Sequence, residues 1–417
     1  MAQLAEPTAA ADSPVPLRRN RDFLLLWSGL VVSTLGSRIS ATAYPLLVLA
    51  LTGSPADAGL VGFLATLPYL LVQLPAGALV DRVDRKRLMI ACDTGRGFAL
   101  ASLGVALWLG EPGLAQIMVV ALVEGTLFVL FNLAETAAVR QVVPAEQLPA
   151  ALSQNEARNR GAAMAGYPIG GFLFGLGRAV PFLVDAVSYL ASIATLLLIR
   201  RPFQEQRVEP RRHLLREIGE GIAWLWGQPF LRAAAVLVAG SNLLFQALVL
   251  VLIVIARDNG ASSAMIGVML AGAGVGGVLG SLAAPWLQRR VSGRLVVIGA
   301  NWVWALLVAP VAFVGNPYAL GALFAVMAFV GPAWNVVIGA YQLTLTPEPL
   351  LGRVASAELL VAYGAIPLGS LAAGFLLEWI GGTGTALAIA GFMLALAIAA
   401  TVSPAVRAAP RLSARGP

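Results

Sequence analysis

The chain has 417 residues, of which 59% are hydrophobic and only 12% are charged, and its mean hydropathy is +0.82. Soluble chains average about 45–50% apolar and about 25% charged residues, so this composition indicates a lipid-embedded protein and excludes a soluble enzyme or a disordered tail protein. The formal net charge of +7 comes from arginines in short gaps between apolar blocks, which indicates membrane topology and argues against nucleic acid as a partner.

Apolar runs of helix length follow one another along almost the whole chain. A helix needs about 20 mostly apolar residues to cross a bilayer, and these runs are continuous, unlike the short alternating segments of a membrane β-barrel. They predict an all-α membrane protein with twelve transmembrane helices, at residues 23–51, 59–80, 88–109, 114–139, 155–177, 179–199, 231–256, 263–287, 295–314, 318–343, 354–378 and 383–403.

The distribution of basic residues predicts the topology. If the N-terminus is inside, most of the 28 Lys and Arg residues fall in inner segments, as the positive-inside rule requires. We therefore expect a multi-pass protein of the cytoplasmic membrane with both termini in the cytoplasm.

The two halves of the sequence are weakly related at an offset near 200 residues. Residues 143–153 align with 346–356, and 167–171 align with 366–370. The pattern predicts two pseudo-symmetric six-helix bundles, which can rock about a shared central site. The expected segments are a cytoplasmic tail 1–22, an N-terminal bundle 23–199, a cytoplasmic loop 200–230 with an amphipathic helix, a C-terminal bundle 231–403 and a cytoplasmic tail 404–417.

Ionisable and polar residues within the spans are the candidate cavity residues, because each ionisable group costs about 2.5–3.5 kcal/mol to insert. Glu124 lies about 15 Å along its span, where a carboxylate could exchange a proton, face a cationic substrate or be only structural. Arg38 could pair with Glu124 or Asp185, attract an anionic substrate, or snorkel to the outer surface. Asp185 could lie at the cavity mouth or have a cap-like structural role, and Asn242 and Gln246 could line the cavity or link helices by hydrogen bonds.

Asp93 and Arg96 are spaced i, i+3 near the inner end of the third span. Residues at this spacing lie on one face of a helix. We therefore expect them to pair with each other, and the pair could also brace a gate on the cytoplasmic side.

Small residues and prolines gather in the second and fifth spans. Glycines let transmembrane helices pack closely or bend, and a proline allows a kink. We expect packing and hinge roles at Gly77, Gly166, Pro168, Gly170 and Gly171.

The run Gly77-Ala-Leu-Val-Asp81-Arg82-Val-Asp-Arg85-Lys86-Arg87 resembles the loop motif of the major facilitator superfamily. The twelve-span layout extends this resemblance over nearly the whole chain. Residues 35–40, 93–96 and 181–185 resemble the drug:proton antiporter branch with macrolide-efflux and enterobactin exporters. Two departures stand beside it: the fifth-span proline comes one place late, and residues 119–139 contain no arginine.

The resemblance implies that this loop is a cytoplasmic gate, locking the two halves together in the outward-facing state. Asp81 would cap a helix of the second half near residues 354–356. Arg82, Arg85 and Arg87 would hold partner carboxylates. The alternative is that the cluster only sets the topology.

These features predict a secondary active transporter that exports a moderately apolar small molecule, such as a drug, a macrolide-like compound or a siderophore, in exchange for protons. Since no nucleotide-binding loop is present and the chain has one cysteine and one histidine, we expect no ATP hydrolysis, metal, cofactor or enzymatic activity. The expected partners are the substrate, protons and the bilayer, with the protein as a monomer. The alternatives are uncoupled or facilitated transport of a metabolite or siderophore and, more remotely, a membrane sensor or scaffold.

Overall fold

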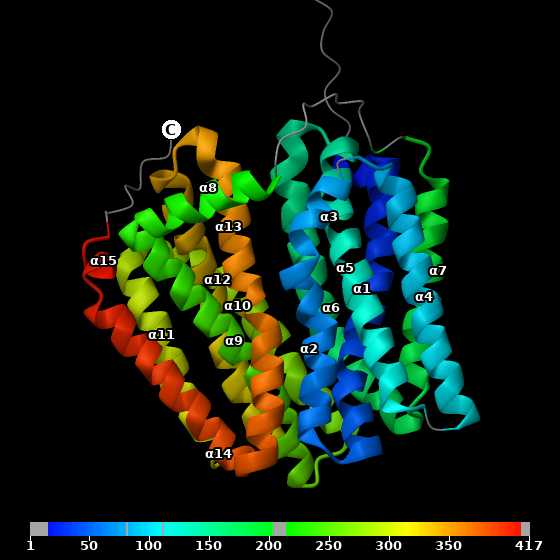
Figure 1. Ribbon diagram of the computed structural model, residues 1–417. Coiled ribbons are helices and arrows are strands. Elements are labelled where there is room, and N and C mark those ends of the chain that lie inside the picture. Colours follow the sequence, from blue (N-terminus) through cyan, green and yellow to red (C-terminus); the bar gives the residue numbers. More distant parts are fainter. Residues whose placement is uncertain (1–15, 81, 111, 202, 204–213, 410–417) are drawn as a thin grey trace, which may run out of the picture.

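The computed structural model describes residues 16–80, 82–110, 112–201, 203 and 214–409, and the regular elements within these ranges are all helices (Figure 1). The first half of the chain forms α1 (Arg21–Thr52), α2 (Pro55–Leu71), α3 (Gln73–Val80), α4 (Arg85–Leu109), α5 (Leu114–Val142), α6 (Leu148–Leu176) and α7 (Val180–Leu198). The second half forms α8 (Leu214–Gly227), α9 (Pro229–Asp258), α10 (Ser263–Arg290), α11 (Gly293–Val311), α12 (Pro317–Leu345), α13 (Leu351–Gly364), α14 (Ile366–Val402) and α15 (Pro404–Arg407).

Within the described residues, nine helical segments are long and apolar enough to cross a membrane. The prediction of twelve spans is nevertheless confirmed, and three local features account for the difference between nine and twelve. The second span is divided into α2 and α3, the fifth (α6) carries charged residues, and the last segment contains two crossings. At Gly381, φ is +69° and ψ is −179°, a conformation open to glycine, and it turns the chain between those two crossings.

The helices form two bundles that stand side by side (Figure 1). The first bundle contains α1 to α7, in which α2 and α3 together make one of six crossings. The second contains α9 to α14, in which the break at Gly381 divides α14 between the last two of six crossings. Helix α8 packs on α13 and α9 at one end of the molecule, here called the α8 end. The opposite end, where Gly53 with φ +70° joins α1 to α2, is called the Gly53 end.

The two bundles meet along two helix pairs, α6 with α10 and α2 with α14. Glycines face each other in both pairs. A Cβ atom on Gly59 would lie 2.6 Å from the Cα of Gly374, and one on Gly267 would lie 3.2 Å from the Cα of Gly171. In lipid, the hydrophobic effect does not drive helices together, and van der Waals packing at small residues such as these glycines does so instead.

The glycines of α6 that the sequence singles out are divided between two contacts. Gly166 and Gly170 lie against α1, and Gly171 lies against α10 of the other bundle. Pro168 stands inside the unbroken helix α6. Gly77 differs from the expectation, because a Cβ atom there would meet no described atom within 4 Å, so the structure gives it no packing contact.

Candidate functional site

A cavity of about 520 Å³ lies between the two bundles. Its walls come from α1, α2, α4, α5 and α6 on one side and from α9, α10, α12, α13 and α14 on the other. Small-molecule sites measure about 300–1,000 Å³, and transporter sites form where the two repeats meet. Both its size and its position make this cavity the candidate site.

The charges of the cavity all belong to the first bundle. The lining residues with a charged side chain are Arg38, Arg96, Glu124, Glu135 and Arg158. The described lining residues of the second bundle include no Asp, Glu, Lys, Arg or His. The cavity therefore has one charged wall and one largely apolar wall.

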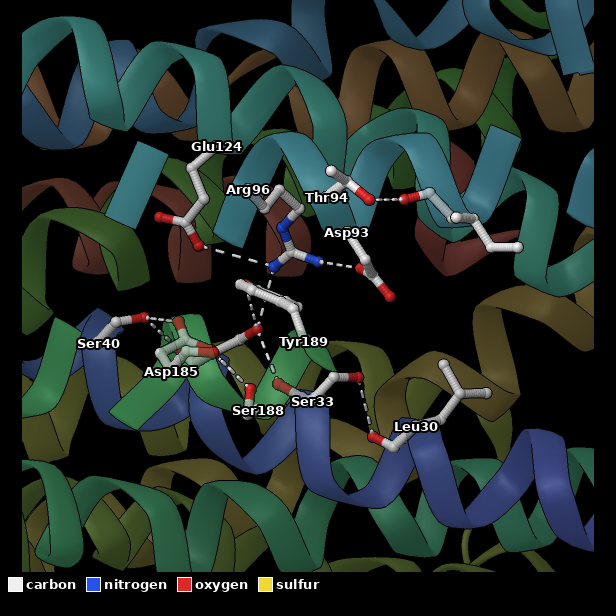
Figure 2. A network of polar contacts seen from close by, with 12 residues as sticks. Leu30, Ser33, Ser40, Asp93, Thr94, Arg96, Glu124, Asp185, Ser188 and Tyr189 are labelled. Atoms are coloured by element: carbon white, nitrogen blue, oxygen red, sulfur yellow. Dashed lines mark hydrogen bonds and ion pairs between the residues drawn. The ribbon is translucent and has the colours of Figure 1, made fainter. Parts of the chain in front are cut away.

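Arg96 is the centre of a buried polar network (Figure 2). Its side chain is 3% exposed, and its Nη1 atom lies 3.6 Å from Oδ1 of Asp93. Its Nη2 atom lies 3.6 Å from Oε1 of Glu124 and donates a hydrogen bond of 3.0 Å to Oγ of Ser37. The guanidinium therefore joins α4 to α5 and to α1.

Aromatic rings enclose the same guanidinium. Its carbon lies 4.4 Å from the ring centroid of Tyr189 and 5.3 Å from that of Phe128. The hydroxyl of Tyr189 is 3.1 Å from Oγ of Ser37. Desolvated cation–π contacts are worth about 2 kcal/mol, so the rings help to hold Arg96 in one position.

This position corrects the expectation that Arg96 and Asp93 belong to a cytoplasmic gate. The two residues do form an ion pair, but Arg96 lines the central cavity. Helix α4 begins at Arg85, so eleven residues at about 1.5 Å each carry Arg96 about 16 Å from the helix start. That distance places the pair near the middle of the bundle.

Asp185 is fully buried between α7 and α1, away from the cavity lining. Its carboxylate accepts hydrogen bonds from Oγ of Ser40 at 2.5 Å and from Oγ of Ser188 at 3.1 Å. Since α7 begins at Val180, Asp185 lies in the second turn and is not a cap. These hydrogen bonds fit a structural role that joins α7 to α1, whereas the expected place at the cavity mouth and a position at a helix end do not match.

Arg38 lines the cavity and is not paired with Glu124 or Asp185. Its Nη1 atom donates a hydrogen bond of 3.2 Å to the hydroxyl of Tyr167, and its guanidinium carbon lies 5.9 Å from that ring's centroid. Arg38 is close to the midpoint of the 32-residue helix α1. From there the side chain points into the cavity and does not snorkel to a membrane surface.

Glu135 and Arg158 form a second buried pair that the sequence analysis missed. Arg158 Nη2 lies 2.8 Å from Oε1 of Glu135, and both line the cavity. Helix α6 begins at Leu148, earlier than the predicted start at 155, so Arg158 lies inside the bundle. Glu135, an acidic residue inside the apolar run 114–139, was the signal in the sequence that pointed to a buried pair.

Asn242 and Gln246 both make contacts within the second bundle. Asn242 Nδ2 donates to the carbonyl of Ala362 at 2.8 Å and links α9 to α13. Gln246 Nε2 donates to Oγ of Ser370 at 3.0 Å, and both of these residues line the cavity. Both residues therefore link helices, which was one of the two expected roles, and only Gln246 also lines the cavity.

The described part of the loop motif contacts its own bundle. Arg85 Nη1 donates to the carbonyl of Phe203 at 3.3 Å, and Lys86 Nζ donates to that of Ile199 at 2.6 Å. Arg87 is 89% exposed and lies 3.9 Å from Asp84. Asp84 caps α4 by accepting from the backbone N–H of Arg87.

Two further gate residues complete the expected set. Asp81 lies outside the described residues, and the side chain of Arg82 is exposed. The gating role implied by the resemblance therefore stays a prediction. Among the described residues, no group of three or more His, Cys, Asp or Glu side chains could hold a metal ion.

A carboxylate from the second bundle caps a helix of the first at the Gly53 end. Glu378 Oε2 accepts hydrogen bonds from Oγ of Ser54 at 3.0 Å and from the backbone N–H of Ala56 at 3.3 Å. These groups lie at the N-terminus of α2, where a negative charge is stabilising by about 0.3–1 kcal/mol. Glu378 therefore helps to hold the two bundles together at this end.

Replacing Glu378 with glutamine is expected to weaken this contact. In a chain without Cys92, maleimide should label Ala58→Cys about two- to fivefold faster when Glu378→Gln is added, because the bundles separate more often. Asp258→Asn removes an exposed charge at the same end and serves as the control. Equal labelling rates with and without Glu378→Gln would show that the cap does not hold the bundles together.

Comparison with known proteins agrees with this architecture. The sequence model of the transmembrane secretion effector family (MFS_3) matches residues 11–414. The multidrug efflux pump Tap of Mycolicibacterium fortuitum is 29% identical over 406 residues, which cover 94% of this chain and 97% of that protein. Macrolide efflux protein A of Streptococcus pyogenes is 25% identical over 205 residues, which cover 49% of this chain and 51% of that protein.

Solved structures share the fold at low sequence identity. A crystal structure of a mutant of the nucleoside transporter NupG matches with a TM-score of 0.79 and 13% identity, covering 93% of this chain and 100% of that one. The D-xylose–proton symporter matches with a TM-score of 0.71 and 14% identity, covering 94% and 99% of the two chains. At such identities the likeness concerns the fold alone.

Proposed function

The chain belongs to the transmembrane secretion effector family, within the major facilitator superfamily of transporters, and on this premise we propose that it exports a moderately apolar small molecule in exchange for protons. Its efflux relatives, a multidrug pump and a macrolide efflux protein, support the direction and the broad substrate class. The apolar wall contributed by the second bundle suits the apolar part of such a substrate.

The orientation that we propose places the α8 end in the cytoplasm. Arginines and lysines are concentrated at that end, including Arg85, Lys86, Arg87, Arg140 and Arg353, and the positive-inside rule puts such residues in the cytoplasm. The Gly53 end then faces outward. Because the cavity is complete within one chain, we propose that the protein works as a monomer in the cytoplasmic membrane.

One observation carries the coupling proposal: Glu124 lines the cavity while its carboxylate lies 3.6 Å from buried Arg96. Its side chain is 15% exposed, so water in the cavity can deliver or accept a proton there. Asp93 and Asp185 are fully buried and outside the cavity lining. Among these carboxylates, Glu124 combines contact with the cavity and contact with the charged network.

The geometry suggests how a proton and a substrate could exclude each other. When ionised, Glu124 neutralises Arg96 from the cavity side. When protonated, it withdraws that negative charge and changes both the local field and the shape of the cavity wall. A carrier that rocks between two open states then moves protons one way and substrate the other, provided that each occupant disfavours the other.

Replacing Glu124 with glutamine tests this assignment. In proteoliposomes with an imposed pH gradient, Glu124→Gln is expected to reduce gradient-driven efflux of a macrolide probe such as erythromycin at least tenfold, while exchange without a gradient continues. This result is expected because glutamine keeps the shape of the side chain but cannot take up a proton. Glu146→Gln, at an exposed position outside the spans, is the control.

One feature of the same site favours uncoupled transport as the second candidate function. Arg96 is fixed by Ser37, Tyr189 and Phe128 and lies 3.6 Å from Glu124, so the charges of this pair balance each other without a proton. In that case, an uncoupler would leave substrate flux unchanged, and Glu124→Gln would lower flux equally with and without a pH gradient. Unchanged gradient-driven efflux in Glu124→Gln would contradict the role of Glu124 in coupling.

A further inference from the structure

The three cavity-lining arginines differ in how their charge is balanced. Arg96 lies beside Asp93 and Glu124, and Arg158 lies beside Glu135. Arg38 has no carboxylate partner among the described residues; its contacts are the hydroxyl and the ring of Tyr167. A phenol is a neutral acceptor, so Tyr167 accepts one hydrogen bond from Arg38 without neutralising its charge.

The packing of α1 on α6 holds Arg38 in this position. A Cβ atom on Gly166 would lie 2.5 Å from the Cβ of Arg38, so glycine allows α6 to approach the base of the arginine side chain. The next residue, Tyr167, then reaches the guanidinium with its hydroxyl. One Nη1 hydrogen bond is satisfied in this way, and the remaining N–H groups have no protein acceptor among the described residues.

Ionisable side chains in the middle of a membrane protein are expensive to keep and are retained when they pair or act. Arg38 lies near the midpoint of α1 and faces the cavity. A guanidinium binds a carboxylate through two parallel hydrogen bonds, which gives both strength and orientation. A bound molecule with a carboxylate can therefore supply the negative charge that Arg38 lacks.

Aromatic side chains line the same cavity. Tyr69 of the first bundle stacks on Tyr363 of the second, with ring centroids 5.6 Å apart and planes 22° apart. Phe128 meets Tyr69 edge-on at 6.2 Å. These rings and the apolar wall of the second bundle suit a flat or apolar body.

We propose that Arg38 is an anchor for an acid group, and that the substrates of this cavity include amphipathic organic acids with a carboxylate and an aromatic or apolar body. The carboxylate binds the free N–H groups of Arg38, and the body lies toward Tyr69 and the second bundle. The identity of this ligand as cargo rests on the proposed transport function. The binding preference itself does not depend on proton coupling.

Equilibrium binding of two matched probes to the purified full-length protein tests the proposal. Dansylglycine carries a carboxylate, whereas dansylglycinamide has a neutral amide in its place. The wild-type protein is expected to bind dansylglycine about tenfold more tightly or better, as charge-assisted hydrogen bonds allow. Arg38→Gln should reduce the difference to about twofold or less by weakening the acid alone, and Arg38→Lys should restore part of it.

The control variant is Arg140→Gln, which removes an exposed arginine at the end of α5 and should keep the full preference. Equal wild-type affinities for the two probes, or no saturable binding of dansylglycine, would overturn the proposal. So would an equal loss of both probes in Arg38→Gln, since that result indicates a structural role. Because no pH gradient is applied, a failure of proton coupling at Glu124 leaves this result unaffected.

Discussion

Replacing Arg96 with methionine is expected to abolish transport and to lower the free energy of unfolding by about 3–5 kcal/mol, the usual cost of breaking a buried ion pair. Asp93 is fully buried, and neither of its carboxylate oxygens has a hydrogen-bond partner among the described residues. The guanidinium of Arg96 at 3.6 Å is its compensating charge. Unfolding of the purified protein in mixed micelles, followed with increasing denaturant, measures the loss.

Two further variants separate the charge effect from the loss of a long side chain. Arg87→Met removes an arginine from the same helix that is 89% exposed, and it should change stability by less than about 0.5 kcal/mol. Asp93→Asn combined with Arg96→Met should recover much of the stability, because it removes the unpaired carboxylate. An Arg96→Met protein as stable as the wild type would show that the network does not hold the bundle together.

The membrane helices could be predicted from the sequence because the bilayer imposes a length on each apolar run. The predicted run 114–139 corresponds to α5 (Leu114–Val142) and the run 263–287 to α10 (Ser263–Arg290). The largest shift is at the start of α6, which begins at Leu148. A helix can continue beyond the hydrocarbon region, and hydropathy marks only the part that lies within it.

The faces of the helices were much harder to predict than their ends. In a soluble protein the apolar face of a helix points inward, but lipid is as apolar as the core of a helical bundle. Phe131 is 4% exposed and lines the cavity, whereas Phe172 is 57% exposed. Nothing in the sequence around these two phenylalanines distinguishes their surroundings.

The position of Glu124 along its helix could be predicted from the sequence, because each residue counted along a spanning helix adds a fixed rise. The same count did not reveal its partner. Arg96 meets Glu124 only because α4 packs on α5 in one particular rotation, and the separate pairing of Arg96 with Asp93 at i, i+3 could be predicted locally. Contacts between helices depend on rotation, and contacts within a helix depend only on spacing.

The sequence repeat predicts symmetry, but the cavity is not symmetric in charge. The first bundle supplies all of the cavity's charged side chains, and the described lining of the second bundle supplies aromatic, aliphatic and neutral polar groups. Rocking the second bundle past a fixed charged wall would change the exposure of Glu124 and Arg38 without breaking the buried network around Arg96. That division keeps the charged side chains of the cavity lining within one bundle.

Replacing Gly374 with leucine is expected to reduce transport at least tenfold by preventing closure at the Gly53 end. A Cβ atom on Gly374 would lie 2.8 Å from the Cα of Gly59 and from the carbonyl oxygen of Pro55. These are backbone atoms, which cannot swing aside, so the leucine must separate the bundles. Overpacking of this kind costs about 1–3 kcal/mol, which is enough to shift the balance between two carrier states about five- to 150-fold.

Transport is measured together with the rate at which maleimide labels a cysteine at the Gly53 end. The two measurements distinguish a carrier that cannot close from a misfolded protein. In the background lacking Cys92, maleimide should label Ala58→Cys at least fivefold faster when Gly374→Leu is present, because Ala58 is 5% exposed while the bundles are in contact. Gly391→Leu is the matched control: it lies on the same helix, and a Cβ atom there meets nothing within 4 Å. Wild-type transport by Gly374→Leu, or unchanged labelling of Ala58→Cys, would mean that this glycine contact does not close the carrier. If Gly374→Leu lost transport but Ala58→Cys was still labelled slowly, an opened Gly53 end could not be the cause of the lost transport.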